Sequence, residues 1–190
     1  MFPFKRRERV NVQNNTLYYR YSTESSTEED MNEMSRLLRT LCRSSNSDII
    51  FLCIGSDRST GDSYGPFVGT MLKEQNFPFH VFGTIAKPVH ALNLKVVLEE
   101  IHHQFRNPII FGVDACLGDN HQIGSIILKD GPLTPGYAIN NLLPAVGNYH
   151  LKGIVNYLDR DYPINSLNST RLDTVMNLAK TTATILLRST

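Results

Sequence analysis

Cysteine is scarce in this sequence, and long apolar runs are missing. The 190 residues include three cysteines, Cys42, Cys53 and Cys116, and no Cys-x-x-Cys pair. This number and spacing indicate neither a disulfide framework nor a zinc ribbon, and they favour a reducing compartment. No apolar run has the length of a membrane span, and none follows the basic segment Lys5–Arg9 as a secretory signal requires. We therefore expect a cytoplasmic protein with no membrane partner.

An excess of charge of either sign is missing as well. The chain has 19 lysine and arginine residues against 18 aspartate and glutamate residues. Proteins that attract nucleic acid or anionic membranes through their overall field carry a clear excess of basic residues. The near-balance predicts no nucleic-acid partner, and the function is expected to depend on a local site.

The first 26 residues differ in composition from the rest of the chain. They contain the basic tip, the tyrosine-rich run LYYRY, which is compatible with a strand, and most of the polar linker STESST. We expect a partly mobile N-terminal arm over residues 1–26 and a single domain over residues 27–190, which is long enough to bury its own core. A helix is predicted from Ser26, with Glu29 in the capping-box position.

Short apolar runs alternate with amphipathic helical stretches in the remaining chain. Strands are predicted at 49–54, 80–85, 109–113, 123–128 and 153–157, and helices at 63–75, 91–105 and from a cap near Ser169, with an apolar side that begins at Leu172. Runs that are apolar on both faces and separated by helices are typical of a parallel sheet covered on both sides. The sequence therefore predicts an α/β fold, a three-layer α/β/α sandwich with a mostly parallel central sheet.

A glycine-rich turn, GSDRSTGDSYG at residues 55–65, directly follows the first of these core strands. It has neither the GK[ST] ending of a P-loop nor G-x-G-x-x-G spacing, and it supplies Asp57 and Asp62, which repel a phosphate. Asp114 ends the predicted strand 109–113. Because the carboxyl ends of parallel strands meet at one edge of the sheet, Asp62 and Asp114 are expected to converge there.

Two converging aspartates are compatible with two kinds of chemistry, and their spacing does not decide between them. Close carboxyl groups do not both ionise cheaply, so one keeps its proton and the pair can act as acid and base on a water that attacks an amide. Alternatively, Asp62 and Asp114 share a divalent metal with a histidine, for which His150 and His90 are the leading candidates. Asp62 can also serve only as a cap of the helix that follows it.

Other residues of these loops are candidates for supporting or substrate-binding roles. They are Asp57, Thr60, Gly61 and His90. His90 follows the second core strand, where it can equally cap the next helix. Cys116, two residues after Asp114, is interpreted as a buried thiol because no base is identifiable beside it.

Three segments together resemble a known family. The segments CIGSDRSTGDSYGPFVGTML, VDACLGD with GSIILKDGPLTPG behind it, and PAVGNYHLKGIVN resemble the YyaC family of sporulation proteins over roughly residues 30 to 190. That family is related to the germination (spore) protease and, more distantly, to the hydrogenase maturation proteases. The resemblance implies their fold, a phosphorylase/hydrolase-like α/β/α sandwich.

The resemblance also implies roles for particular residues. Asp62 in TGDSYGP and Asp114 in VDACLG match the two aspartates of the aspartic-type site in the spore protease. In hydrogenase maturation proteases, a glutamate and an aspartate at these places bind nickel of the hydrogenase precursor together with a histidine, for which His150 is the best match. Asp62 departs from that glutamate, which favours the spore-protease reading.

The function implied is peptide-bond hydrolysis in a protein substrate such as a small acid-soluble spore protein, in the forespore or spore core. No cofactor is required in this reading, whereas a divalent metal belongs to the alternative one. A second hypothesis is a non-catalytic sporulation protein that binds a metal or a peptide at the same site. The sequence leaves open whether the protein forms a homo-oligomer.

Overall fold

The structure, a computed structural model, describes residues 17–135 and 143–190. Within these residues, six strands form one sheet in the order β1-β5-β6-β4-β2-β3. The elements are β1 (Tyr18–Ser22), α1 (Glu28–Arg43), β2 (Ile49–Cys53), a 3₁₀ turn (Gly61–Ser63), α2 (Tyr64–Glu74), β3 (His80–Phe82), α3 (Leu94–Gln104), β4 (Ile109–Gly118), a second 3₁₀ turn (Asn120–Gln122), β5 (Ser125–Asp130), β6 (Tyr149–Tyr157), α4 (Pro163–Asn168) and α5 (Leu172–Leu187). The strands β6, β4, β2 and β3 run parallel, and β5 is antiparallel to both neighbours. This confirms the α/β fold with a mostly parallel sheet.

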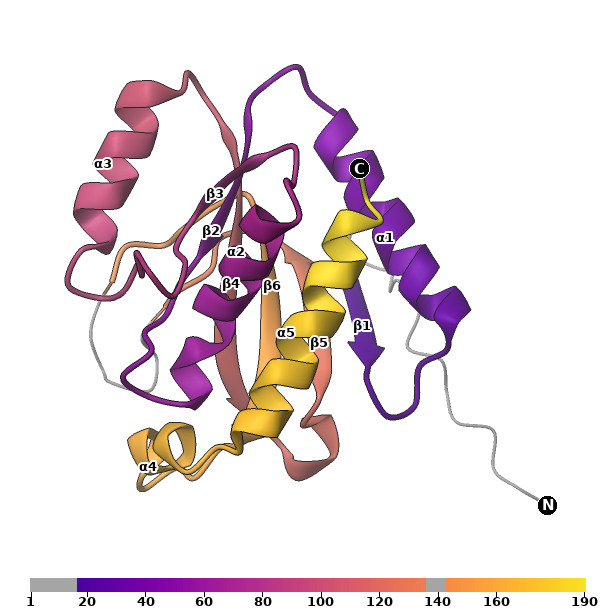
Figure 1. The fold of residues 1–190 in the computed structure, drawn as a ribbon, viewed down its shortest axis with the longest axis vertical. Helices are drawn as coiled ribbons and strands as arrows, with labels where there is room; N and C mark the ends of the chain where they lie inside the picture. The colour runs from indigo at the N-terminus through magenta and orange to yellow at the C-terminus, as the bar shows by residue number, and fades with distance from the viewer. Residues whose placement is uncertain (1–16, 136–142) are drawn as a thin grey trace.

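Helices cover the two faces of the sheet unequally (Figure 1). Leu38 of α1, Leu72 of α2 and Leu186 of α5 are buried in one core cluster with Phe51 of β2. The other face carries α3, in a second core cluster that includes the neighbouring strand residue Ile50. Successive side chains of a strand point to opposite faces, so burial of all five residues of β2 requires both layers.

The tyrosines of the run LYYRY lie in strand β1, as expected. This strand pairs antiparallel with β5 at one edge of the sheet, and its residues Tyr19 and Tyr21 are buried. The predicted arm over residues 1–26 therefore includes a strand of the sheet. The basic tip of that arm, within residues 1–16, lies outside the described residues.

The N-terminal cap predicted for the first helix is wrong by one residue. Thr27 is the N-cap of α1: its Oγ1 accepts a hydrogen bond from the Asp30 N–H at 3.2 Å, and its own N–H donates to Asp30 Oδ2 at 2.8 Å. Ser26 has a different partner, because its Oγ accepts from the Ser22 N–H at 2.9 Å. That bond closes the turn after β1, and the capping box forms one residue later.

The cap predicted at Ser169 is also wrong. Ser169 follows α4, a six-residue helix that the sequence pattern does not predict and that begins with Pro163. Helix α5 starts at Leu172 after Arg171, which makes no side-chain capping bond. The Leu172 side chain is 55% exposed, so the apolar side of α5 begins at Val175.

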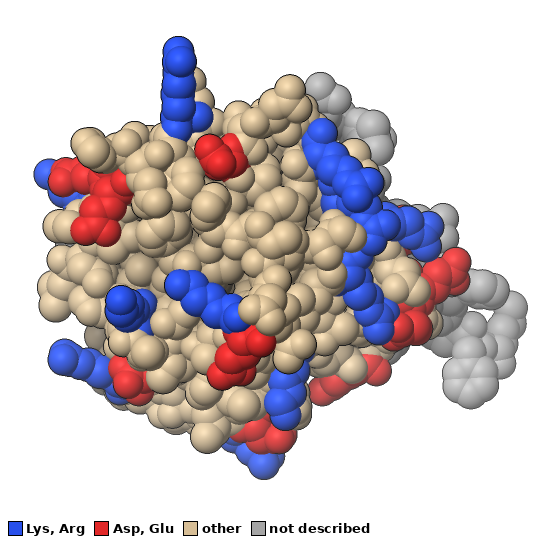
Figure 2. All heavy atoms as spheres, turned by 45° about the horizontal axis from the view of Figure 1, so that its top comes forward, with Lys and Arg blue, Asp and Glu red and all other residues tan. Residues whose placement is uncertain are grey.

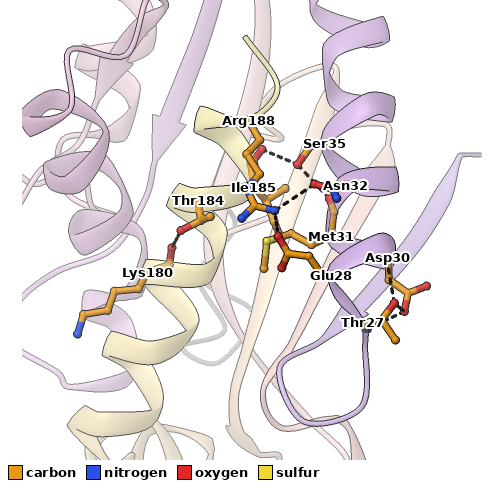
Figure 3. Close-up of polar contacts among 10 residues, drawn as sticks. All are labelled: Thr27, Glu28, Asp30, Met31, Asn32, Ser35, Lys180, Thr184, Ile185 and Arg188. Atoms are coloured by element: carbon orange, nitrogen blue, oxygen red, sulfur yellow. Dashed lines mark hydrogen bonds and ion pairs between the residues drawn. The ribbon is translucent and has the colours of Figure 1, made fainter.

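Helices α1 and α5 are joined by polar contacts as well as by apolar packing (Figure 3). The buried Ser35 Oγ lies 2.9 Å from the Ile185 carbonyl oxygen and 3.0 Å from that of Met31. Near the helix end, Arg188 donates to Glu28 and to Asn32 Oδ1. Ile185 lies in the last turn of α5, where carbonyl groups have no partner in the helix, so Ser35 satisfies one of them.

Ser35→Ala is expected to lower the free energy of unfolding by about 1–2 kcal/mol, because it leaves a buried carbonyl without its donor. Urea denaturation of both proteins measures the difference. Thr40→Ala is the matched control, since Thr40 is exposed on the same helix and its hydroxyl donates to the Arg36 carbonyl, its one hydrogen bond among the described residues. Equal losses in the two variants would show that the contact with α5 is not the cause.

The molecular surface carries charges of both signs. Figure 2 shows basic and acidic side chains spread over the visible face, with neither sign covering it. No helix in the described part of the chain combines the length and apolar character of a membrane span.

Candidate active site

A cavity of about 540 Å³ lies at the carboxyl ends of β2 and β4. Asp62, His90 and Asp114 line it together, although they come from three separate segments. Its other walls are the second half of β4, Lys152 of β6, the segment after β5 and helix α4. The sheet edge predicted to hold the site therefore has a cavity, and the two aspartates converge in it.

The glycine-rich turn is shaped by close backbone contacts. Gly55 has φ +140°, and a Cβ there would lie 2.0 Å from the Asp62 carbonyl oxygen. That same oxygen accepts from the Ser56 N–H at 3.1 Å. At Gly65, a Cβ would lie 2.1 Å from the Ile54 carbonyl oxygen. Glycine lets the turn and the start of α2 approach the end of β2, which brings Asp62 over the sheet edge.

Asp114 lies within a strand rather than at its end, which corrects the predicted boundary. Strand β4 continues to Gly118, but its ladder with β2 stops at the Cys53–Val113 pair. Beyond that pair β4 is flanked by β6, and Asp114 stands directly opposite Lys152. The Asp114 side chain therefore reaches the cavity at the point where β2 has ended, and the residue is only 9% exposed.

The two carboxyl groups have unequal environments. Burial, together with the negative charge of Asp62, raises the pKa of Asp114 to about 8, against the opposing effects of Lys152 and the Ala115 N–H. Burial also raises the pKa of Asp62, while the Ser56 N–H and His90 favour its charged form. At neutral pH Asp114 keeps its proton, and Asp62 is the group that ionises first.

His90 lines the cavity, but it is not the cap of the next helix, because the N-cap of α3 is Asn93. Its backbone N–H donates to Asn93 Oδ1 at 2.8 Å, in the turn that begins α3. Its ring Nδ1 accepts a hydrogen bond from the Leu92 N–H at 3.3 Å. The ring also lines the cavity, where it favours the charged form of Asp62.

His150 is not brought to the cavity. It is buried in β6, where its Nδ1 lies 2.9 Å from the Gly131 carbonyl oxygen, and burial lowers its pKa. Within the described residues, no group of three or more histidine, cysteine, aspartate or glutamate side chains is placed to hold a metal ion. The Lys152 cation opposite Asp114 also disfavours a second cation there. The described donors thus do not fit a resident divalent metal.

The remaining candidates of the turn lie outside the cavity lining. Asp57 is exposed to solvent. The Thr60 carbonyl accepts from Ser63 Oγ at 2.6 Å, and a Cβ at Gly61 would lie 2.9 Å from the Leu167 carbonyl of α4. Thr60 and Gly61 therefore hold the turn in place against its neighbours.

Several cavity residues have no role at the site in the prediction from the sequence. Ser59 lines the cavity, and its Oγ is shielded from solvent without a hydrogen-bond partner among the described residues. Cys116 also lines it, with a pKa raised mainly by burial. Lys152 follows His150 by two residues, so the alternation of side chains along a strand places both on one face of β6. Only the register with β4 shows that Lys152 is paired with Asp114.

Comparisons with known proteins relate this chain to a family, a curated protein and a solved structure. The family model described as "Protein of unknown function (DUF1256)" matches residues 22–185. "Uncharacterized protein YyaC" of Bacillus subtilis (strain 168) is 45% identical over 149 residues, which cover 77% of this chain and 72% of the relative. The [NiFe] hydrogenase maturation protease HycI from Thermococcus kodakarensis KOD1 aligns with a TM-score of 0.49 at 18% identity, over 79% of this chain and 98% of the other.

Proposed function

The chain belongs to the family described as "Protein of unknown function (DUF1256)", and we propose that it is a peptidase whose water is activated by Asp62 and Asp114. The observation that carries the proposal is the pair of carboxyl groups in one cavity, where burial raises the pKa of both and the negative charge of Asp62 raises that of Asp114 further, to about 8. Carboxyl pairs with separated ionisation supply an acid and a base at neutral pH.

The proposed reaction assigns one role to each carboxyl group. The Asp62 carboxylate takes a proton from water as the water oxygen bonds to the scissile carbonyl carbon. The protonated Asp114 gives its proton to the carbonyl oxygen, so a neutral tetrahedral intermediate forms. As the C–N bond breaks, the leaving nitrogen takes the proton held by Asp62, and the oxygen returns a proton to Asp114. Both aspartates regain their starting states.

The surroundings of the cavity suit a peptide. Leu158 and Ile164 line the cavity and remain partly exposed, and Leu92, beside the lining residue Ala91, is 86% exposed. Exposed apolar side chains in or beside a cavity that holds a few polar groups are typical of surfaces that bind other molecules. By the family resemblance, the proposed substrate is a small acid-soluble spore protein, cleaved in the forespore or spore core.

The first test is incubation of the purified full chain with a small acid-soluble spore protein, followed by intact-mass spectrometry, with EDTA and with added Mg²⁺ or Mn²⁺ in parallel. The expected result is discrete cleavage that neither EDTA nor metal changes. Cleavage that is lost with EDTA would replace the two-aspartate mechanism by a metal-dependent one. Binding without cleavage in every condition would overturn the peptidase and support a non-catalytic peptide-binding protein.

A further inference from the structure

The cavity holds a cation beside its protonated carboxyl group. Lys152 of β6 pairs in register with Asp114 of β4, and both side chains line the cavity. Directly paired residues of neighbouring strands point to the same face, and the strands are roughly 4.8 Å apart. The separation between the two side-chain bases is therefore set by the sheet.

The Lys152 ammonium has unused hydrogen-bonding capacity. Within residues 17–135 and 143–190 it makes no hydrogen bond, and the ion pairs found there join other residues. A salt bridge with Asp114 would be the simplest structural reason for a lysine at this position. Asp114 is instead a carboxyl group that holds its proton through neutral pH, so the cation faces a neutral partner. Three N–H donors at a cavity wall are then available to an acceptor from outside the chain.

The position of Lys152 relative to Asp114 indicates which acceptor it meets. A carbonyl oxygen that takes a proton from Asp114 lies next to the neighbouring strand and therefore near Lys152. Leu117, Leu143 and Leu167 add apolar side chains to the same lining. The cavity thus offers a cation and an acid to one carbonyl oxygen. Its apolar walls can contact the side chain of the residue to which that carbonyl group belongs.

We propose that Lys152 binds the oxygen of the scissile carbonyl and, after cleavage, the new carboxylate of an apolar residue held in the cavity. The inference rests on the proposed peptidase function and adds to it a catalytic residue and a class of substrate, peptides cut after an apolar residue. Lys152 donates a hydrogen bond to this oxygen and transfers no proton in the proposed reaction. It stabilises the negative charge that develops on the oxygen before the Asp114 proton is fully transferred.

The product carboxylate allows a test that requires no turnover. N-acetyl-leucine has one apolar side chain and a free carboxylate, and N-acetylleucinamide differs only in its neutral amide. Binding of each to the full chain at pH 7 is followed by NMR chemical-shift titration, for wild type, Lys152→Met, Lys152→Arg and Lys180→Met. Lys180 is exposed on α5 and serves as the control for loss of one positive charge.

Wild type and Lys180→Met are expected to bind the carboxylate at least tenfold more tightly than the amide. Lys152→Met should lose about tenfold in affinity for the carboxylate and none for the amide, and Lys152→Arg should keep most of the preference. Equal binding of the two probes by wild type, or an unchanged preference in Lys152→Met, would overturn the inference.

Kinetics separate this inference from the function on which it rests. With a cleaved substrate, Lys152→Met is expected to reduce kcat by about 10²-fold while KM changes little, the usual result of removing one donor to a developing oxyanion. An unchanged kcat would overturn the role of Lys152 and leave the peptidase intact. Carboxylate binding through Lys152 in a protein that cleaves nothing would have the opposite meaning. It would support the carboxylate-binding role of Lys152 and overturn the proposed peptidase function.

Discussion

Replacing Asp114 by asparagine is expected to reduce peptide cleavage by about 10²- to 10⁴-fold, the range for loss of a general acid or base. Asparagine keeps the size of the side chain, but it has no acidic proton to give to the carbonyl oxygen. Asp62→Asn should have a similar effect, because the amide does not take a proton from water. The rates are measured by intact-mass spectrometry on equal amounts of folded protein.

The double variant and a neighbouring aspartate complete this experiment. Asp62→Asn with Asp114→Asn should be little worse than either single change, because groups that act as a unit lose their effect together. Asp57→Asn is the matched control, since Asp57 lies in the same turn as Asp62 but is exposed and outside the cavity lining. Near wild-type cleavage by Asp114→Asn would rule out the proposed acid.

The second large effect concerns stability and does not depend on any substrate. Asp114 in the unfolded chain ionises near its ordinary pKa of 3.8, whereas in the folded protein the pKa is about 8. Between these values the unfolded state releases a proton that the folded state retains, so stability falls as pH rises from about 4 to about 8. For one group the loss is on the order of 5 kcal/mol by pH 8.

Asp114→Asn is therefore expected to be more stable than wild type at pH 8 and about equally stable at pH 4. Urea denaturation of both proteins at pH 4, 6 and 8 measures the free energies of unfolding. In the variant, Asp62, whose pKa is also raised, should still cause a smaller fall in the free energy of unfolding as the pH rises. Parallel pH dependence in the two proteins would mean that Asp114 titrates at its ordinary pKa.

The sequence permits good prediction where one local pattern determines the structure. The run at 49–54 is apolar at every position, and β2 is buried at all five of its residues. Asp62 and Asp114 follow two such runs, which is why their meeting at one sheet edge is predictable from the sequence alone. Helix caps are harder, because Ser26 and Thr27 are adjacent and chemically alike. A contact with Ser22, in the preceding strand, decides between them.

Features that depend on strand pairing are not accessible from the sequence. Nothing local to Lys152 indicates that it faces Asp114, since the register joins residues 38 positions apart. The sequence also does not show that Asp114 lies inside β4, because this depends on the pairing of β4 with β6 beyond the end of β2. Helix α4 is short and follows a polar segment, so its periodicity gives little signal, yet Ile164 and Leu167 form part of the cavity.

The unequal lengths of β2 and β4 divide the site into parts with different tolerance to sequence change. Asp114 and Lys152 are spaced by a backbone ladder, so insertions or substitutions in the surrounding loops leave their spacing unchanged. Asp62 is held by the turn that contacts the strand end at Gly55, where no side chain fits. A relative of this chain that lost that glycine would shift one carboxyl group relative to an intact second one. We therefore expect sequence changes in the turn to alter activity within the family before changes in the sheet do.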